Sequence, residues 1–525
     1  MNNETTKLQS RDRGDSSPHN QKSGEQRHRH RQRHEQRPRH DQQRPPLVAV
    51  HRPAPQIGTQ RHLQHAQPSQ PHTQGPRIFS RGRIPGARLE IIPLGGYGEV
   101  GRNSVAVRVD DEIVILDMGL MMEKYVEYTD SDELVELSGR KLIEIGAAPD
   151  VNILGDEKRN VKGILLTHAH LDHIGAVPFL ANRFECDIHA TPFTIELVRK
   201  MFDEEERLTR GKLVSHDINE RFRVGEKIEA EFINITHSVP QTVMILLHTP
   251  YGKVMYANDF KFDNNPTLGP KPNYARLREL TGQVDYLILD SLYAEQPIKT
   301  PSEKIAEEML KDVLLGTQSR DATIIVTTFS SHIARLRAIV NVAKLMKRHP
   351  VFLGRSLRKY VEAAEAVGIA DFSDVEIVGY GNKVKPYLKR VREPEKYLFV
   401  ATGHQGEPKA MLSRIVEQRL LPLMDNDIVV FSSKTIPVPV SIENRKRLDE
   451  KLQARHVRIF SDIHVSGHGA REDERDFLNM LKPKHIIPTH GTPSALAAFK
   501  ELAEEVGYRP EQVRIVANGE RVRVA

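Results

Sequence analysis

The run GILLTHAHLDHIGA, residues 163–176, constrains the fold of this chain more than any other segment. Its apolar part ends at Thr167, and four ligand-type side chains follow within six positions: His168, His170, Asp172 and His173. The apolar part predicts a buried strand, and side chains on the loop that leaves it can converge on one point. Imidazole and carboxylate together suit Zn²⁺ or Mn²⁺, and burying them without partners would be costly. We therefore predict a site for two ions, because one loop cannot offer all four ligands to one ion with good geometry.

Three further candidate ligands stand where other apolar runs end. His237 follows EFINIT, Asp259 follows KVMYA by one residue, and His490 follows HIIPT. Loops at neighbouring strand ends meet, so these side chains would complete a dinuclear set. A single Asp or His at a strand end is more often a turn or cap residue, so the prediction depends on the whole set.

The first 80 residues differ in composition from the rest. They carry 14 Lys and Arg against 6 Asp and Glu, whereas the remaining chain is close to neutral. Residues 1–78 hold nine histidines and no aromatic residue. Such a segment cannot bury enough apolar surface to offset its ordering entropy, so we expect a disordered basic tail that contacts phosphates loosely. Metal capture by its histidines is the alternative. The high isoelectric point is a property of this tail and says nothing about the folded part.

From Arg88 onward, short apolar runs alternate with helical patterns, which predicts an α/β protein. Strands are expected at 161–167, 231–236, 243–249, 253–257 and 285–290. Helices are expected at 175–182, 191–202, 303–315, 332–346, 357–367, 407–418, 443–453, 472–481 and 493–506. A second alternation within 302–462 predicts another α/β unit with a mostly parallel sheet.

Several protein classes are excluded by composition. No run approaches about 18 apolar residues, so no membrane span is expected. The N-terminus lacks an apolar signal segment, and the single cysteine, Cys186, rules out intramolecular disulfides and cysteine-rich zinc sites. We expect a cytoplasmic protein in which Cys186 is a small buried residue rather than a nucleophile.

Seven motifs in this order resemble the metallo-β-lactamase fold, its β-CASP nuclease branch, and within that branch the archaeal type of the ribonuclease J family: THAHLDHIGA, ITHSVP, NDFKFD, LILDSLYAE, ATGHQGEP, HVSGHG and IPTHGTP. The resemblance implies an αββα sandwich formed by 81–301 and 463–525, with a β-CASP α/β domain inserted at 302–462. The chain departs from the commoner GDF and TGSQ at NDF and TGHQ. We expect no further domain after the last motif.

The resemblance also implies a ligand set for two Zn²⁺ per subunit, with Mn²⁺ or Mg²⁺ as substitutes. One ion would be held by His168, His170 and His237, and the other by Asp172, His173 and His490. Asp259 would bridge them. Asp117, in VILDMG, would orient the metal-binding loop from outside the ligand set, although a polar strand end would look the same in sequence.

The resemblance assigns substrate handling to the later motifs. His468 would be the catalytic acid/base and Asp290 its proton-transfer or orienting partner, with a turn residue as the alternative for Asp290. The segment His464, Val465, Ser466, Gly467 and His468 would grip substrate phosphate, with an ordinary glycine loop as the alternative. Ser331 and His332 stand at a strand-to-helix turn and could simply cap the helix, whereas Arg335 and Arg355 could contact RNA or lie on a solvated helix face.

The implied activity is metal-dependent hydrolysis of single-stranded RNA, chiefly as a 5′-to-3′ exonuclease on 5′-monophosphorylated ends, by a homodimer. A cleavage-and-polyadenylation-type endonuclease of the same fold is the first alternative. A small-molecule hydrolase would lack the 302–462 insertion. A non-catalytic RNA-binding scaffold would be expected to have lost ligands, and all seven are present here.

Overall fold

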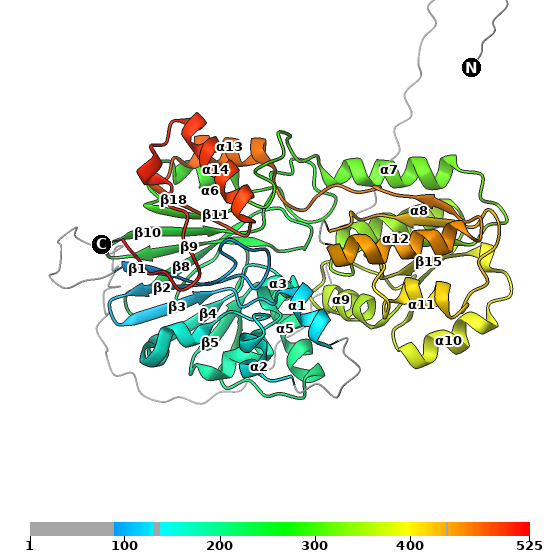
Figure 1. Ribbon diagram of the computed structural model, residues 1–525, viewed down its shortest axis with the longest axis horizontal. Coiled ribbons are helices and arrows are strands. Elements are labelled where there is room, and N and C mark those ends of the chain that lie inside the picture. Colours follow the sequence, from blue (N-terminus) through cyan, green and yellow to red (C-terminus); the bar gives the residue numbers. More distant parts are fainter. Residues whose placement is uncertain (1–88, 130–136, 437–438, 525) are drawn as a thin grey trace, which may run out of the picture. The chain divides into compact units, whose positions relative to one another are not determined.

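The computed structural model of the protein describes residues 89–129, 137–436 and 439–524, so the expected tail at 1–80 lies outside the described residues. The described chain belongs to one compact unit and forms three β-sheets with helices on their faces (Figure 1). Among the described helices, none is both long and apolar enough to cross a membrane.

Two of the sheets pack face to face. The strand order of the first is β19 (Val522–Arg523), β1 (Leu89–Gly95), β2 (Ser104–Val109), β3 (Glu112–Leu116), β4 (Val161–Leu165), β5 (Asp187–Ala190) and β6 (Leu213–Ser215). The strand order of the second is β18 (His485–Thr489), β11 (Tyr286–Asp290), β10 (Gly252–Ala257), β9 (Val243–Thr249), β8 (Glu229–Asn234) and β7 (Arg221–Arg223). Side chains alternate between the two faces of each strand: Val105 and Val107 join the core between the sheets, and Ala106 faces the outer helices.

Helices cover both outer faces of this pair of sheets. Those on the first sheet are α1 (Met122–Thr129), α2 (Gly139–Glu144), α3 (Leu171–Ile174), α4 (Val177–Leu180) and α5 (Pro192–Glu204). Those on the second are α6 (Tyr274–Glu279), α13 (Arg471–Leu481) and α14 (Pro493–Val506). The arrangement is the αββα sandwich of the metallo-β-lactamase fold, as the resemblance implied.

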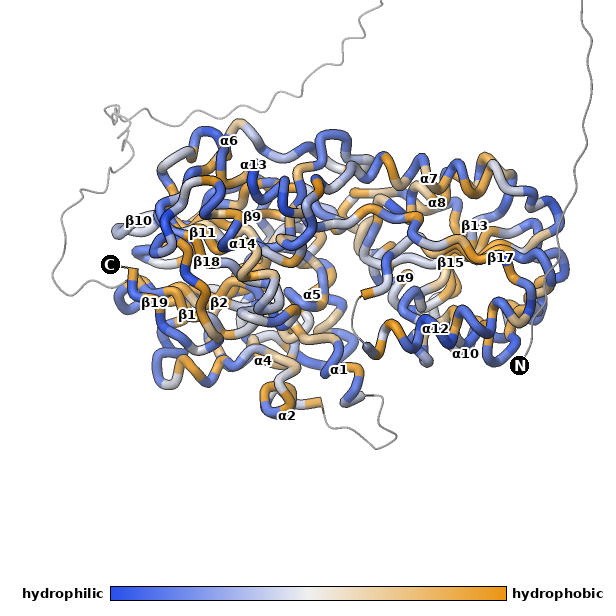
Figure 2. Tube along the Cα trace, turned by 45° about the horizontal axis from the view of Figure 1, so that its top comes forward, coloured by the Kyte–Doolittle hydropathy of each residue, from blue (hydrophilic) through white to orange (hydrophobic). Residues whose placement is uncertain are grey.

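The third sheet is parallel throughout and lies between two helix layers. Its strand order is β14 (Glu376–Val378), β13 (His349–Leu353), β15 (Tyr397–Ala401), β12 (Ile324–Thr327), β16 (Ile428–Phe431) and β17 (Arg458–Phe460). One face packs on α7 (Glu303–Gly316), α8 (Ile333–Leu345) and α9 (Arg355–Ala366), and the other on α10 (Gly381–Arg390), α11 (Met411–Glu417) and α12 (Pro439–Gln453). Figure 2 shows β13, β15 and β17 as an apolar centre among helices of mixed polarity, because a parallel sheet is buried on both faces. This sheet confirms the expected second α/β unit.

One expected helix is wrong in an instructive way. The prediction placed a single helix at 175–182 and left all four ligand-type residues of the first motif on a loop. The helix instead starts at Leu171 with α3, and after Gly175 the chain enters α4, so Asp172 and His173 lie in a helical turn. His170, in extended backbone, is the N-cap residue of α3. The short helix, rather than a loop alone, directs the second half of the motif.

Candidate metal centre

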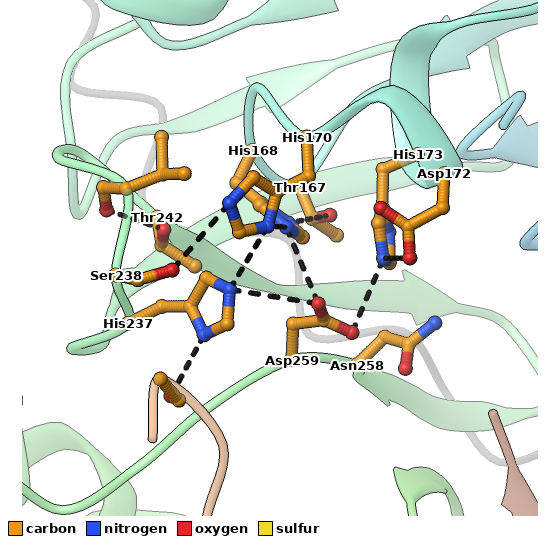
Figure 3. Close-up of polar contacts among 12 residues, drawn as sticks. Thr167, His168, His170, Asp172, His173, His237, Ser238, Thr242, Asn258 and Asp259 are labelled. Atoms are coloured by element: carbon orange, nitrogen blue, oxygen red, sulfur yellow. Dashed lines mark hydrogen bonds and ion pairs between the residues drawn. The ribbon is translucent and has the colours of Figure 1, made fainter. Parts of the chain in front are cut away.

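All seven predicted ligands lie together where the chain leaves β4, β8, β10 and β18. Figure 3 shows six of them: His168, His170, Asp172, His173, His237 and Asp259. The ligand atoms of all seven form two groups, and within each group all ligand atoms lie within 4.8 Å of one another. The first group is His168, His170, His237 and Asp259, and the second is Asp172, His173 and His490. Parallel and neighbouring strand ends bring these distant segments to one edge of the sandwich.

The first group has the spacing of ligands around one ion. His170 Nδ1 lies 3.1 Å from His168 Nε2 and 3.1 Å from His237 Nε2. Asp259 Oδ2 lies 3.4 Å from His168 Nε2 and 3.5 Å from His237 Nε2. A tetrahedron with metal–ligand distances near 2.1 Å has edges of about 3.4 Å. The four side chains therefore fit a single tetrahedral cation.

The second group shares Asp259 with the first. Asp259 Oδ1 lies 3.1 Å from His173 Nε2 and 3.9 Å from His490 Nε2, and Asp172 Oδ2 lies 3.5 and 3.9 Å from the same two nitrogens. The two oxygens of this one carboxylate thus face different groups.

Asp259 is itself in an unusual environment. It is buried, and within the described part of the chain neither of its oxygens accepts a hydrogen bond of regular geometry. A buried carboxylate without such bonds is costly, and cations between it and the imidazoles would remove that cost. The residues present therefore fit a metal centre.

Asp117 holds one of the imidazoles. The Asp117 carboxylate is completely buried, with Oδ2 2.8 Å from His173 Nδ1, and it accepts hydrogen bonds from the backbone N–H and hydroxyl of Thr167. A proton on Nδ1 leaves the Nε2 lone pair of His173 free for a cation. Burial disfavours the charged ring, but Asp259, Asp172 and Asp117 together raise the pKa of His173 well above its ordinary value.

Asn103 was not identified from the sequence, yet it touches three predicted ligands. Its Oδ1 accepts from His490 Nδ1 at 2.8 Å, and its Nδ2 lies 3.1 Å from the carbonyl oxygen of Asp172 and 3.1 Å from His173 Nε2. An asparagine in GRNS gives no chemical signal of such a role, and only the fold brings it near.

The third sheet also reaches this centre. The hydroxyl of Ser331, in the turn before α8, lies 3.1 Å from His170 Nε2, so His170 presents Nδ1 to the first group. His332 caps α8, accepting from the N–H of Arg335, as the simpler alternative had it.

Both expectations for Arg335 are wrong: it is neither at an RNA-facing surface nor solvated, but completely buried against Glu303. Arg355 is exposed at the start of α9.

His468 and Asp290 form a pair beside the two groups. His468 Nδ1 lies 2.8 Å from Asp290 Oδ2, and its Nε2 lies 3.6 Å from Asp259 Oδ2. Burial acts against the charged ring, but Asp259 and Asp290 raise the pKa of His468 to about 9. Asp290 Oδ1 also accepts from the N–H of Leu292, so the same aspartate serves as a turn residue.

The HVSGHG segment is held closely against the first group. Gly467 O accepts from His237 Nδ1 at 2.7 Å, and Ser466 Oγ accepts from the N–H of His468. Val465 is buried, and the N–H groups of Val465, Ser466 and Gly467 donate no hydrogen bond within the described residues. Burial and the nearby Arg335 lower the pKa of His464 to about 2, so its ring is neutral.

Three family profiles match this chain. The metallo-β-lactamase superfamily profile matches residues 97–285, that of the ribonuclease J β-CASP domain 321–445, and that of the Zn-dependent metallo-hydrolase RNA specificity domain 455–516. A crystal structure of a protein of unknown function from Enterococcus faecalis shares the fold, with a TM-score of 0.57 and 16% identity over 83% of this chain and all of that one. The family and the His/Asp cluster together indicate a metal-binding protein.

Curated relatives are similar over most of their length. Ribonuclease J of Methanocaldococcus jannaschii is 44% identical over 82% of this chain and 98% of its own. Ribonuclease J of Pyrococcus abyssi is 40% identical over 83% and 97%. Ribonuclease J 1 of Streptococcus pyogenes is 31% identical over 82% and 73%, so the archaeal relatives are the more similar. This chain belongs to the ribonuclease J family and is of the archaeal type.

Proposed function

We propose that this chain is a metal-dependent ribonuclease that hydrolyses phosphodiesters of single-stranded RNA, chiefly 5′ to 3′ from a 5′-monophosphorylated end. The observation that carries the proposal is Asp259, whose two carboxylate oxygens face two separate imidazole groups with His468 beside them. The direction of cutting rests on the family resemblance and on the ribonuclease J relatives.

We assign the seven ligand-type residues to two Zn²⁺ per subunit, which Mn²⁺ or Mg²⁺ could replace. His168, His170 and His237 would hold one ion; Asp172, His173 and His490 the other; and Asp259 would touch both. Bound there, two divalent ions supply charge neutralisation for a phosphodiester and lower the pKa of an attacking water.

The chain's own groups would handle the substrate and the proton. The free N–H groups of Val465, Ser466 and Gly467 point to a backbone cradle for a phosphate oxygen. His468 would donate a proton to the leaving 3′-oxygen, and Asp290, 2.8 Å from its Nδ1, would keep the other ring nitrogen protonated. Asn103 and Asp117 would fix the orientation of the ligand imidazoles.

The same family membership supports a proposal about the wider setting of the reaction. We propose that the protein works in the cytoplasm as a homodimer, and that its domains divide at 301/302 and at 462/463. The buried single thiol supports a reducing compartment.

The test uses one body-labelled RNA of 20–40 nucleotides carrying a 5′-monophosphate, triphosphate or hydroxyl, digested with Mn²⁺ or Zn²⁺. Wild type, His468→Ala and the matched exposed-histidine control His349→Ala would be compared. Mononucleotides released from the monophosphate substrate by wild type and the control, and lost in His468→Ala, are expected. Internal fragments regardless of the 5′ group would replace this proposal with the endonuclease. Absence of cleavage with metals bound would leave an RNA-binding scaffold.

A further inference from the structure

We propose that a buried charge network, made of Lys261, Asp263, Glu303 and Arg335, positions the His464–His468 segment for RNA, and that Arg335 and Lys261 are positioning residues of the reaction. The inference rests on the proposed function of that segment. The network lies where the chain passes twice between the second and third sheets, at Thr300–Glu303 and at Ser461–Ser466.

Arg335 joins the two passages through one guanidinium. It is completely buried, and its Nε and Nη2 donate to Glu303 Oε1 at 2.6 Å and Oε2 at 2.9 Å. Its Nη1 donates to the carbonyl and hydroxyl oxygens of Ser432, at the end of β16, and to the carbonyl of Ile463 at 3.2 Å. The Ser432 hydroxyl donates in turn to the same Ile463 carbonyl at 2.9 Å. Arg335 therefore fixes the backbone one residue before His464.

Lys261 fixes the same segment at its middle residue, Ser466. Its ammonium is buried and donates to the carbonyl of Ser466 at 3.0 Å and to that of Pro301 at 3.4 Å. It also lies 3.7 Å from Asp263 Oδ2, which accepts from the N–H of Glu303 at 2.8 Å. The donors on Arg335 and Lys261 thus hold His464 and Val465, the two residues between Ile463 and Ser466, from both sides.

Stability alone explains this network poorly. Removing four charges from water is expensive, and well-packed apolar side chains of similar size often stabilise a core as well or better. A paired guanidinium and carboxylate instead fix direction and distance, because each bond tolerates little change in geometry. Displacing a substrate-holding segment by about 1 Å can cost on the order of 100-fold in rate. The network supplies that fixed geometry from the third sheet to the segment beside the metal centre.

The matched comparison is between two buried arginines that contact the strand ends of the same sheet. Arg348 donates to the carbonyls of Ala322 and Tyr397, at the starts of β12 and β15, whereas Arg335 acts at the opposite strand ends. We would prepare Arg335→Met, Arg335→Lys and Arg348→Met as metal-loaded proteins. Each would be assayed on 5′-monophosphorylated RNA and on bis(4-nitrophenyl) phosphate, a small diester that has one phosphate and no strand.

For Arg335→Met we expect kcat/KM for RNA to fall at least about tenfold more than kcat/KM for the small diester, with metal content unchanged. Arg335→Lys should recover part of the lost kcat/KM for RNA. Arg348→Met should change kcat/KM for RNA and for the small diester by the same factor. An Arg335→Met protein whose two activities fall equally would overturn the proposal. So would an Arg348→Met protein that shows the same RNA-selective loss.

Two further measurements keep the test decisive. If Arg335→Met does not fold, Ser432→Ala removes only the hydroxyl that bridges Arg335 and Ile463, and a smaller RNA-selective loss is expected from it. RNA binding by metal-loaded His468→Ala proteins, with and without Arg335→Met, gives a readout without turnover. If wild type fails to cut RNA, the proposed function fails, whereas equal RNA binding by the two His468→Ala proteins would refute the network.

Discussion

Adding one methyl group at Gly467 should displace a predicted metal ligand. A Cβ built at Gly467 would lie 2.8 Å from Ser238 Oγ, 2.9 Å from Ser238 Cβ and 2.9 Å from His237 Cε1. Ordinary contact begins at 3.4 Å, so the His237 ring or the 464–468 segment must move by about 0.5 Å. The same segment accepts the His237 Nδ1 hydrogen bond, at 2.7 Å, and that bond would be strained.

The expected cost of Gly467→Ala is on the order of 10- to 100-fold in metal affinity or kcat/KM, the range found when a bond that orients a metal ligand is lost. Overpacking adds about 1–3 kcal/mol of destabilisation. Metal content by mass spectrometry, RNA cleavage and the unfolding midpoint would be measured together. Gly316→Ala is the control, because a Cβ there meets nothing within 4 Å. A Gly467→Ala enzyme with wild-type metal affinity and activity would refute the close packing of this segment on His237.

Four other outcomes are expected. The Asp290→Asn enzyme should retain its metals but lose about 10²- to 10⁴-fold in kcat, measured on RNA at saturating metal, because His468 Nδ1 loses its charged partner. Removing metal with a chelator should abolish cleavage and lower the melting temperature, with about 2.7 kcal/mol of stability returning when free metal reaches 100 times its Kd; an unchanged melting temperature would contradict a folded-state metal centre. Cys186 is buried and its thiol pKa is raised to about 12 by burial and Asp187, so a disulfide reagent at pH 8 should label it only after denaturation. Burial alone would raise the pKa of Glu231, but His248 and Arg276 lower it to about 2. The stability that Glu231 contributes is therefore complete above its ordinary pKa of 4.5 and is lost as the pH falls toward 2. The free energy of unfolding of Glu231→Gln, measured with denaturant across that pH window, should depend less on pH than that of wild type.

Much of the fold was accessible from the sequence because its pattern is locally strong. The helix expected at 493–506 coincides with α14, which starts with Pro493 after a Thr492 cap and ends at Val506, followed by Gly507 in a left-handed conformation. The helices α1, α2, α6 and α10 were not predicted. Helix α1 has no buried residue, so no apolar side marks it as a core helix, and α10 contains Pro386, which argues against a helix interior although Val384 and Leu388 are buried one turn apart.

Some residues of the candidate site could be predicted from the sequence and others could not. The ligand residues could be predicted because His and Asp are common metal ligands, and because their positions at the ends of apolar runs predicted that they meet at one edge of the sheets. Asn103 and Ser331 could not, since an amide or a hydroxyl is common everywhere and acquires its role only from contacts with His490 and His170. The burial of Arg335 could not be predicted, because a helical arginine is ordinarily solvated. No local sequence pattern indicates that Glu303, 32 residues away, is buried beside it and pairs with it.

Three carboxylate or imidazole residues in and around this centre have left-handed backbone conformations. Asp117, Asp259 and His490 all have positive φ, at 59°, 41° and 52°, a region that residues other than glycine seldom adopt. Each stands within two residues of the end of a strand, at β3, β10 and β18. Glycine would turn the chain there at a lower conformational cost but would offer no ligand. Holding a residue in such a conformation costs about 1–3 kcal/mol. Asp and His enter this region more often than most side chains, and Asp110, His456 and Asp462 adopt it elsewhere in the described chain. The conformation therefore permits Asp259 and His490 at these turns, and it is their convergence with the other imidazoles and carboxylates that indicates a metal centre.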